Sequence, residues 1–216
     1  EKPMAMSAAE CRQMIDACQA AGVRLMVCYY QRFNARHQKA RDLARAGAIG
    51  RVTLAAARMF SFNPPSPGAW RYDPARGGGG ALMDLGVHCI DTLRFILGEV
   101  EQVAAQCEAL AFDAAVDDTA TLLLRFQSGV QGVVSVAFSA PAVDVESASS
   151  LELWGTGGQI WTAPLHAKDS SGALWLRTPA GEERFSGAGR THVALIEAFG
   201  RAIKEGGPTP APGEEG

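Results

Sequence analysis

Residues 119–139 read TATLLLRFQSGVQGVVSVAFS, two β-rich segments, Thr119–Phe126 and Val130–Ser139, on either side of the turn signal Ser128-Gly129. Similar short segments, separated by turn signals such as Gly157-Gly158, occur at Val100–Phe112, Leu151–Trp154, Gln159–Trp161, Leu174–Thr178 and Glu182–Phe185. Short strands at this spacing are typical of a meander, so this half of the chain predicts a largely antiparallel sheet.

The sequence on either side of this region predicts helices and one more strand. Asn34–Ala46 and Thr191–Glu205 have the apolar spacing of amphipathic helices, Ala81–Leu97 predicts a mostly apolar helix, and Arg51–Phe62 predicts a strand. Asn63–Gly80 holds four prolines and ends in four consecutive glycines, which predicts a long irregular loop. Loops of this length inside a compact domain are usually functional or disordered.

The first thirty residues have the pattern of half an α/β repeat. Ser7 and Glu10 fit a capping box, apolar residues then recur at spacings of three and four, and Gly22 ends the predicted helix. Val23–Tyr30 is mostly apolar and predicts a strand that is buried on both faces, as in a parallel sheet. The chain as a whole is therefore predicted to be α/β, with an α+β domain after this first part.

The composition excludes several classes of function. The chain has 216 residues, of which 47% are hydrophobic and 20% charged. Its net charge is −3, so it lacks the excess of basic residues that is typical of proteins that bind nucleic acid or an anionic membrane. No apolar run reaches the length of a membrane-spanning helix. The five cysteines form no CxxC pair, and we interpret them as small buried hydrophobes in a reducing compartment, which predicts a cytoplasmic location. Because the chain opens on Glu1-Lys2-Pro3, we expect it to be a piece of a longer protein.

The densest polar cluster lies in the predicted helix, between Asp84 and Asp91. Asp84 and His88 are four residues apart, so on an α-helix they share a face, and a carboxylate beside an imidazole can orient the ring. Histidine is the side chain best suited to exchange a proton near neutral pH. Two alternatives stay open: a core histidine satisfied by its helix neighbour, or a metal site with Asp91, for which a third ligand is missing.

Two further candidates lie outside this helix. Lys2 is either a frayed cationic terminus or part of a site, and Trp70-Arg71-Tyr72 either binds a polyhydroxylated ligand or pins its own loop. The glycine run Gly77–Gly80 lets backbone or ligand approach the helix start closely. It lacks the G-x-G-x-x-G form of a dinucleotide fingerprint, and Gly155-Thr156-Gly157-Gly158 precedes a strand, so the chain predicts no nucleotide-phosphate loop of its own.

Several ordered motifs together resemble the glucose–fructose oxidoreductase / inositol dehydrogenase (Gfo/Idh/MocA) family. They are Glu1-Lys2-Pro3, Tyr29-Tyr30-Gln31-Arg32-Phe33, Ala48-Ile49-Gly50-Arg51-Val52, the run Gly78–Asp91, Leu151–Gly158 and the ending Phe199–Gly216. The resemblance implies two domains: residues 1–30 as the remnant of a dinucleotide-binding Rossmann domain, and residues 31–216 as a substrate-binding and oligomerisation domain. It implies helices on one face of a large, open sheet, a homodimer or homotetramer through the sheet, and a last helix that lies beyond this chain.

The resemblance also implies roles for individual residues. Lys2, Asp84 and His88 match the family's catalytic residues: His88 would accept a proton from a substrate hydroxyl, Asp84 would stabilise the imidazolium, and Lys2 would hold the substrate oxygen. The residues implied in substrate binding are Trp70, Arg71 and Asp91. Those implied in cofactor binding are Glu1, Lys2, Pro3 and Arg32, and no metal is implied.

The implied activity is hydride transfer between the nicotinamide of NAD or NADP and a carbinol carbon of a sugar, polyol or sugar derivative. One alternative is an NAD-dependent glycosidase that oxidises its substrate transiently. Another, for this chain alone, is a non-catalytic substrate-binding and oligomerisation module, and we expect the isolated chain to bind NAD(H) negligibly.

Overall fold

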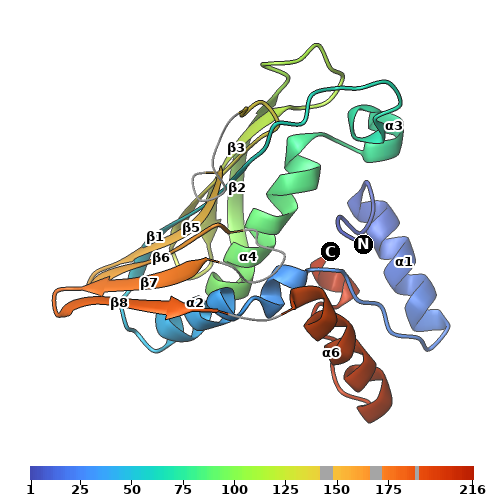
Figure 1. Cartoon of the computed structure of the whole chain (residues 1–216). Coiled ribbons are helices and arrows are strands. Elements are labelled where there is room, and N and C mark those ends of the chain that lie inside the picture. Colours follow the sequence, from blue (N-terminus) through green and yellow to red (C-terminus); the bar gives the residue numbers. More distant parts are fainter. Residues whose placement is uncertain (142–147, 166–171, 188–189) are drawn as a thin grey trace.

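The computed structural model describes residues 1–141, 148–165, 172–187 and 190–216 and contains one eight-stranded sheet (Figure 1). Its strand order is β2-β3-β4-β1-β5-β6-β7-β8; only the β1–β4 pair is parallel among the described strands, and the other pairs are antiparallel. The mostly antiparallel sheet predicted from the sequence is thus confirmed. The strands are β1 Val52–Phe60, β2 Val100–Glu108, β3 Thr119–Phe126, β4 Gln131–Ala137, β5 Ser149–Gly155, β6 Gly158–Ala163, β7 Ala173–Thr178 and β8 Gly181–Ser186.

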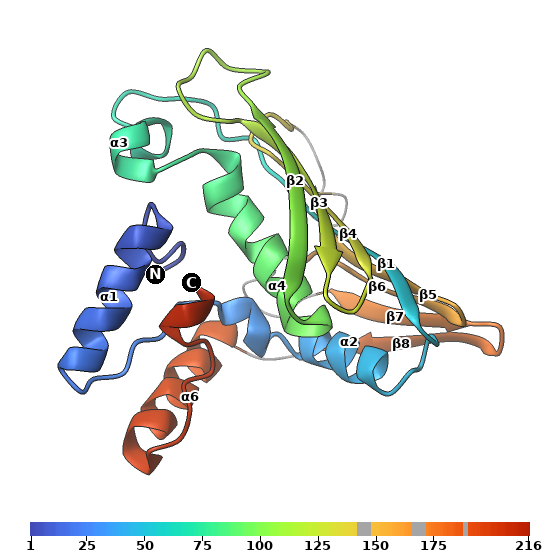
Figure 2. The same cartoon turned by 180° about the vertical axis from the view of Figure 1, so that it is seen from behind.

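The helices near the sheet lie on one of its faces, as Figure 2 shows from behind. Helices α2 and α4 contact sheet strands, whereas α1 and α6 stand away from the sheet beside the two chain ends (Figure 1). No described helix is long and apolar enough to cross a membrane. The helices are α1 Ala8–Ala20, α2 Ala35–Arg45, α3 Pro74–Gly77, α4 Val87–Leu97 and α6 Thr191–Glu205, with shorter turns η1 Tyr30–Phe33, η2 Trp70–Tyr72, η3 Leu82–Gly86 and η4 Gly213–Glu215.

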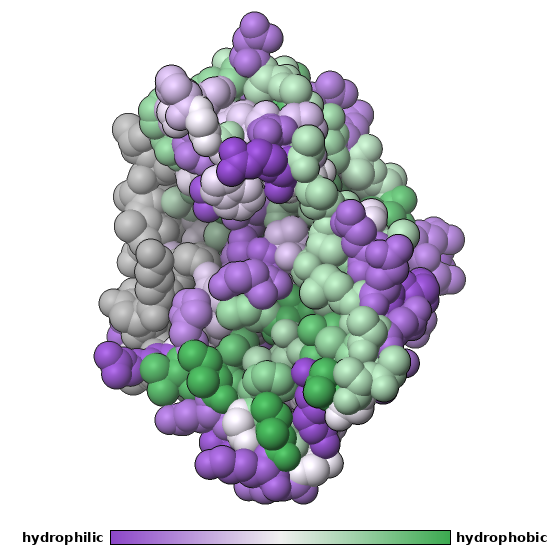
Figure 3. All heavy atoms as spheres, turned by 90° about the vertical axis from the view of Figure 1, so that its right-hand side faces the viewer, coloured by the Kyte–Doolittle hydropathy of each residue, from purple (hydrophilic) through white to green (hydrophobic). Residues whose placement is uncertain are grey.

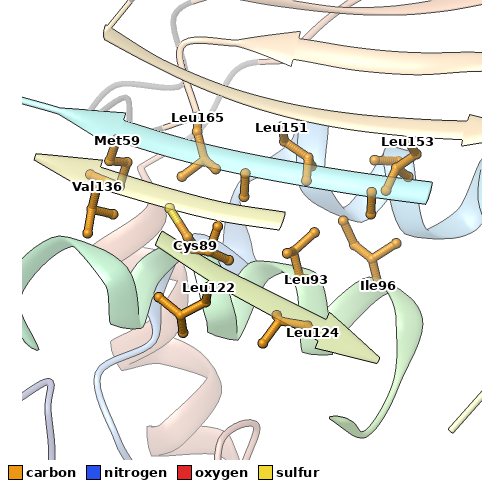
Figure 4. Close-up of a cluster of buried hydrophobic side chains, with 14 of the residues drawn as sticks. Met59, Cys89, Leu93, Ile96, Leu122, Leu124, Val136, Leu151, Leu153 and Leu165 are labelled. Atoms are coloured by element: carbon orange, nitrogen blue, oxygen red, sulfur yellow. The ribbon is translucent and has the colours of Figure 1, made fainter. Parts of the chain in front are cut away.

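The main core lies between α4 and the sheet, and Figure 4 shows it in detail. Along β3 every second residue is buried, so Leu122 and Leu124 point to the helix side while Leu123 between them is 60% exposed. From α4, Cys89 and Leu93 are fully buried against these strands. This burial anchors α4 firmly, which matters because the candidate site lies at its first turns.

The segment Val23–Tyr30 differs from its prediction. It forms no strand: Val23 is 58% exposed, and the segment makes one isolated bridge, between Met26 and Pro212. The prediction of a strand buried on both faces is therefore wrong for this chain. Its apolar run has no sheet to join among the described residues, because the eight described strands form a single sheet that lies elsewhere.

The cysteines also differ in part from their prediction. All five are free thiols, and of these Cys89 is buried, Cys11, Cys18 and Cys28 are half-buried and Cys107 is exposed. Cys107 is exposed because it lies on β2, an edge strand that no described helix covers. The absence of disulfides agrees with the sequence-based interpretation, whereas the burial of every cysteine does not.

Candidate functional site

The start of the helix that carries the polar cluster is held by an aspartate that sequence reasoning missed. The Asp117 carboxylate accepts hydrogen bonds from the backbone N–H groups of Gly80 (2.9 Å) and Leu82 (2.8 Å), and its carbonyl accepts one from Ala81 (2.9 Å). A Cβ atom at position 80 would lie 1.7 Å from the Asp117 carbonyl oxygen, so this contact requires glycine. The loop before β3 thereby fixes where the helix begins.

The predicted helix Ala81–Leu97 begins with a π turn rather than an α turn. Residues Leu82–Gly86 form η3, a π-helical turn, and α4 follows directly from Val87. Such turns are rare and are frequently found at functional sites. Because Asp84 lies on the π turn and His88 on α4, the segment from Asp84 to His88 does not have the geometry of a regular α-helix.

Lys2 reaches this turn from the other end of the chain. Its ammonium lies 2.8 Å from Asp84 Oδ1 and 2.7 Å from the Asp84 carbonyl oxygen. The second carboxylate oxygen, Oδ2, accepts a hydrogen bond of 3.0 Å from Arg71 Nε. Burial alone would raise the pKa of Asp84, but the hydrogen bonds and charges of Lys2 and Arg71 outweigh burial and lower it. Asp84 is thus a carboxylate shared between two cations.

Arg71 brings the long loop into the site. Its guanidinium lies over the ring of Trp70, with 4.6 Å from Cζ to the ring centroid, and that ring is itself 45% exposed. Tyr72 pins the loop, since its hydroxyl donates to the Asn63 carbonyl. Arg71 donates only through Nε in the described contacts, and its side chain is 41% exposed. The Tyr72 contact supports the reading in which the cluster pins its own loop. The reading in which Trp70 and Arg71 bind a polyhydroxylated ligand stays a prediction.

His88 is buried, with 4% of its surface exposed, and lies against an aromatic ring. The Tyr30 ring is 5.4 Å from it, centroid to centroid, at an angle of 67°. The described hydrogen bonds of Asp84 go to Lys2 and Arg71, so the expected carboxylate–imidazole bond is not among the contacts of the described residues. The role of Asp84 as partner of the imidazolium therefore stays a prediction.

Asp91 and Arg32 are buried together in a separate ion cluster. Arg32 Nε lies 2.8 Å from Asp91 Oδ1, and the same guanidinium forms an ion pair with Glu215 of η4. Burial raises the pKa of Asp91 to about 6, against the opposing effect of Arg32. None of these contacts involves Lys2 or Asp84. The placement indicates a structural tie between α4 and the C-terminal turn. Asp91 also lines the cavity that contains Pro3, so the substrate and cofactor contacts expected for this pair stay predictions.

The remaining candidates lie beside Lys2. Pro3 lines a cavity of about 330 Å³ together with Met83 and Val87, whereas the Glu1 side chain is exposed. Within the described ranges, no group of three or more histidine, cysteine, aspartate or glutamate side chains could hold a metal ion. The metal alternative with Asp91 still lacks a third ligand among these residues, and Arg32 binds one oxygen of that carboxylate.

The side of the molecule that carries α1 and α6 has mixed polarity (Figure 3). Apolar patches alternate there with hydrophilic side chains. Large apolar residues on these two helices are exposed: Met14 on α1, and Val193, Ile196 and Ile203 on α6. Helix α1 has no buried residue at all.

Comparison with known proteins identifies the family. The family model described as "GFO/IDH/MocA C-terminal domain" matches residues 37–161, which is more than half of the chain. The chain belongs to the GFO/IDH/MocA family. The matched residues include β1, the Trp70-Arg71 loop and the helix with Asp84 and His88, so the family assignment covers most of the candidate site. Lys2 precedes the matched residues.

Relatives in this family include enzymes that act on sugars. The chain is 33% identical to 1,5-anhydro-D-fructose reductase of Ensifer adhaerens, over all of this chain and 65% of the relative. It is 35% identical to D-apiose dehydrogenase of Paraburkholderia graminis, over 64% of this chain and 36% of the relative. The structure of aldose-aldose oxidoreductase from Caulobacter crescentus, in complex with glycerol, matches with a TM-score of 0.89 and 27% identity, over 99% of this chain and 64% of that chain. The chain thus spans less than two thirds of these relatives.

Proposed function

We propose that the protein to which this chain belongs is an NAD(P)-dependent oxidoreductase that transfers a hydride between nicotinamide and a carbinol carbon of a sugar, polyol or sugar derivative. The observation that carries the proposal is the meeting of Lys2 with Asp84 on the π turn just before His88. Sugar-directed reductases and dehydrogenases among the relatives support the substrate class.

Lys2 is proposed to bind the reacting oxygen. Its ammonium has three N–H groups, and two of them are directed at the carbonyl and carboxylate oxygens of Asp84. The third has no partner in the part of the chain that the structure describes, so it is the donor left for a substrate oxygen. Charge-assisted hydrogen bonds of this kind stabilise negative charge that develops on such an oxygen.

His88 is proposed to exchange the hydroxyl proton as hydride leaves or reaches the same carbon. A positioned general base of this kind typically contributes about 10²- to 10⁴-fold in rate. In this geometry Asp84 holds and orients the Lys2 ammonium, and its role as partner of the imidazolium stays a prediction. Arg71 and Trp70 offer a partly exposed guanidinium and an aromatic ring, a combination that suits a polyhydroxylated ligand.

The cofactor is proposed to contact this chain through its nicotinamide end only. When bound, nicotinamide supplies or accepts the hydride at its C4 atom. The cavity at Pro3 has an apolar wall that includes Met83 and Val87, which suits a flat ring. The charged side chains of Asp91, Arg94 and Glu215 also line it. The chain offers no glycine-rich phosphate loop, so the diphosphate and the choice between NAD and NADP depend on residues outside it.

A second copy of the chain is the proposed partner at the open face of the sheet, the face opposite α2 and α4. Leu123 is 60% exposed there, and the register places Val133 beside it. Further along, the rings of Trp161 and Trp175 stack at 3.9 Å and 7°. Val133, Trp161 and Trp175 are half-buried, and apolar and aromatic side chains that reach the surface in this way are typical of subunit interfaces. The five free thiols fit the proposed cytoplasmic location.

An assay of the protein with NADH, NADPH and their oxidised forms tests the proposal. We expect sugars or polyols from a panel of aldoses, polyols and anhydro-sugars to change the absorbance of the reduced nicotinamide. Release of p-nitrophenol from a p-nitrophenyl glycoside, with no net change in reduced nicotinamide, would instead support the glycosidase alternative. Failure of every panel member with every cofactor form would contradict the oxidoreductase proposal.

A further inference from the structure

Tyr30 lies between two imidazole rings. On one side its ring meets His88 at 5.4 Å and 67°, and on the other it stacks on His192 at 4.0 Å and 23°. The three residues come from three elements, the turn η1, α4 and the first turn of α6. The array thus joins α6 to the wall of the candidate site.

The chemistry of the Tyr30 phenol limits what this residue can do. Tyr30 is 7% exposed, and burial raises its pKa to about 12. The phenol is therefore neutral across the physiological range and is a poor general base there. The contact that the structure gives between Tyr30 and His88 is made by the two rings, edge to face.

We propose that Tyr30 is a positioning residue for His88 and that His192 holds the Tyr30 ring in place. This inference rests on the proposed function, because it assigns His88 the proton transfer that Tyr30 supports. A ring packed against the imidazole restricts rotation of the His88 side chain and so fixes the direction in which its nitrogens point. Tyr30 itself touches no reacting atom in this account.

The aromatic ring, and not the hydroxyl, is the group that matters in this proposal. We therefore expect Tyr30→Leu to lower kcat by about 10- to 100-fold, since small misplacements of a catalytic group have effects of this size. The KM for substrate and the affinity for the cofactor should change little. Tyr30→Phe keeps the ring and should restore kcat to within about twofold of the parent protein.

His192 offers an independent variant at an exposed position. His192→Ala removes the ring that stacks on Tyr30 and should lower kcat by a smaller factor, about threefold. His192→Phe keeps an aromatic ring at this position and should keep kcat close to that of the parent protein. Phe185→Leu is the control for loss of an aromatic ring elsewhere, because Phe185 lies on β8 beside Lys39 of α2. This control should leave kcat unchanged.

The NMR signals of the His88 ring protons give a readout that is independent of activity. The Tyr30 ring current should displace these signals, so Tyr30→Leu should move them while Tyr30→Phe leaves them nearly in place. If Tyr30→Leu does not fold, the His88 signals and kcat of His192→Ala are compared with those of His192→Phe instead.

Two results would overturn the inference. One is parent-like kcat in Tyr30→Leu with unchanged His88 signals. The other is an equal loss of kcat and thermal stability in Tyr30→Leu that Tyr30→Phe fails to restore, which would indicate a structural role only. If His88→Gln retains full activity, the proposed function fails instead, and the NMR comparison alone then decides whether Tyr30 orients the His88 ring.

Discussion

The ammonium of Lys2 lies 2.8 Å from Asp84 Oδ1, although the two residues are 82 positions apart in the sequence. This contact attaches the start of the chain to the π turn ahead of α4 and places a positive charge at the candidate site. Both side chains are largely covered, with 14% and 23% of their surfaces exposed. The pair therefore links the first residues of the chain to the chemistry proposed around His88.

Loss of the Lys2 ammonium should remove most of the activity. In the protein that carries this chain, Lys2→Met deletes the one donor proposed for the substrate oxygen, and we expect kcat to fall by about 100-fold or more. Steady-state kinetics with the best panel substrate measure the effect. Lys39→Met is the matched control, because Lys39 lies over the Phe185 ring, and it should have parent-like kinetics.

Substitution of Gly80 should disrupt the helix start. An added Cβ would lie 1.7 Å from the Asp117 carbonyl oxygen, so Gly80→Ala forces backbone to move and should lower the free energy of unfolding by about 2 kcal/mol or more. Gly200→Ala is the control in α6, where nothing lies within 4 Å of the new atom; it should be neutral or stabilise the chain by up to about 1 kcal/mol. Urea unfolding of both variants measures the difference, and equal midpoints would refute the close-contact argument.

The stability of the chain should depend on the ionisation of Asp84 in acid. The folded state lowers the pKa of Asp84 below its ordinary value, so the unfolded state binds the proton more readily. The stability that Asp84 contributes is therefore present above the ordinary pKa and is lost as the pH falls through the folded one. Urea unfolding at about pH 7 and about pH 3.5 should show a smaller acid-induced loss in Asp84→Asn than in the parent chain. The same loss in both would show that Lys2 and Arg71 do not stabilise this carboxylate.

A charge on the open face of the sheet should separate the proposed subunits. Trp161→Glu breaks the stack with Trp175 and adds a carboxylate to an apolar surface, so sedimentation should show a shift from dimer or tetramer towards monomer. Gln13→Glu on the exposed side of α1 adds the same charge away from the sheet and should leave the assembly intact. A parent protein that is monomeric at all concentrations would contradict the proposed partner.

The isolated chain should bind NADH negligibly, because the phosphate-binding part of a dinucleotide site is not in its sequence. Calorimetric titration of the chain with NADH measures this directly. Binding in the micromolar range would show that the cavity beside Pro3 and Lys2 holds the dinucleotide without a glycine-rich loop.

Local patterns in the sequence predicted local structure well. The bounds of β3 and α6 agree with the structure to the residue, and Asn34 caps α2 through its side chain, since alternation, amphipathic spacing and capping residues act over a few positions. The π turn at Leu82–Gly86 was not predictable in this way. It depends on Asp117, which lies more than thirty residues downstream and holds the helix start through backbone hydrogen bonds.

The candidate site shows the same division between local and distant causes. Lys2 and Asp84 were expected together only through the family resemblance, because nothing in the spacing of residues 82 positions apart predicts their contact. Arg32 and Asp91 looked functional as polar residues within motifs. Their partner Glu215 lies at the far end of the chain, and only the fold shows that the three form an ion cluster in which Arg32 and Asp91 are buried.

The most direct test of the account is the turnover of His88→Gln in the protein that carries this chain, with a saturating sugar or polyol substrate and its nicotinamide cofactor. The account predicts that kcat falls by about 100-fold or more, while cofactor affinity and thermal stability stay close to those of the parent protein. Turnover of His88→Gln within about threefold of the parent protein would contradict it, because the imidazole would then have no part in the proton transfer.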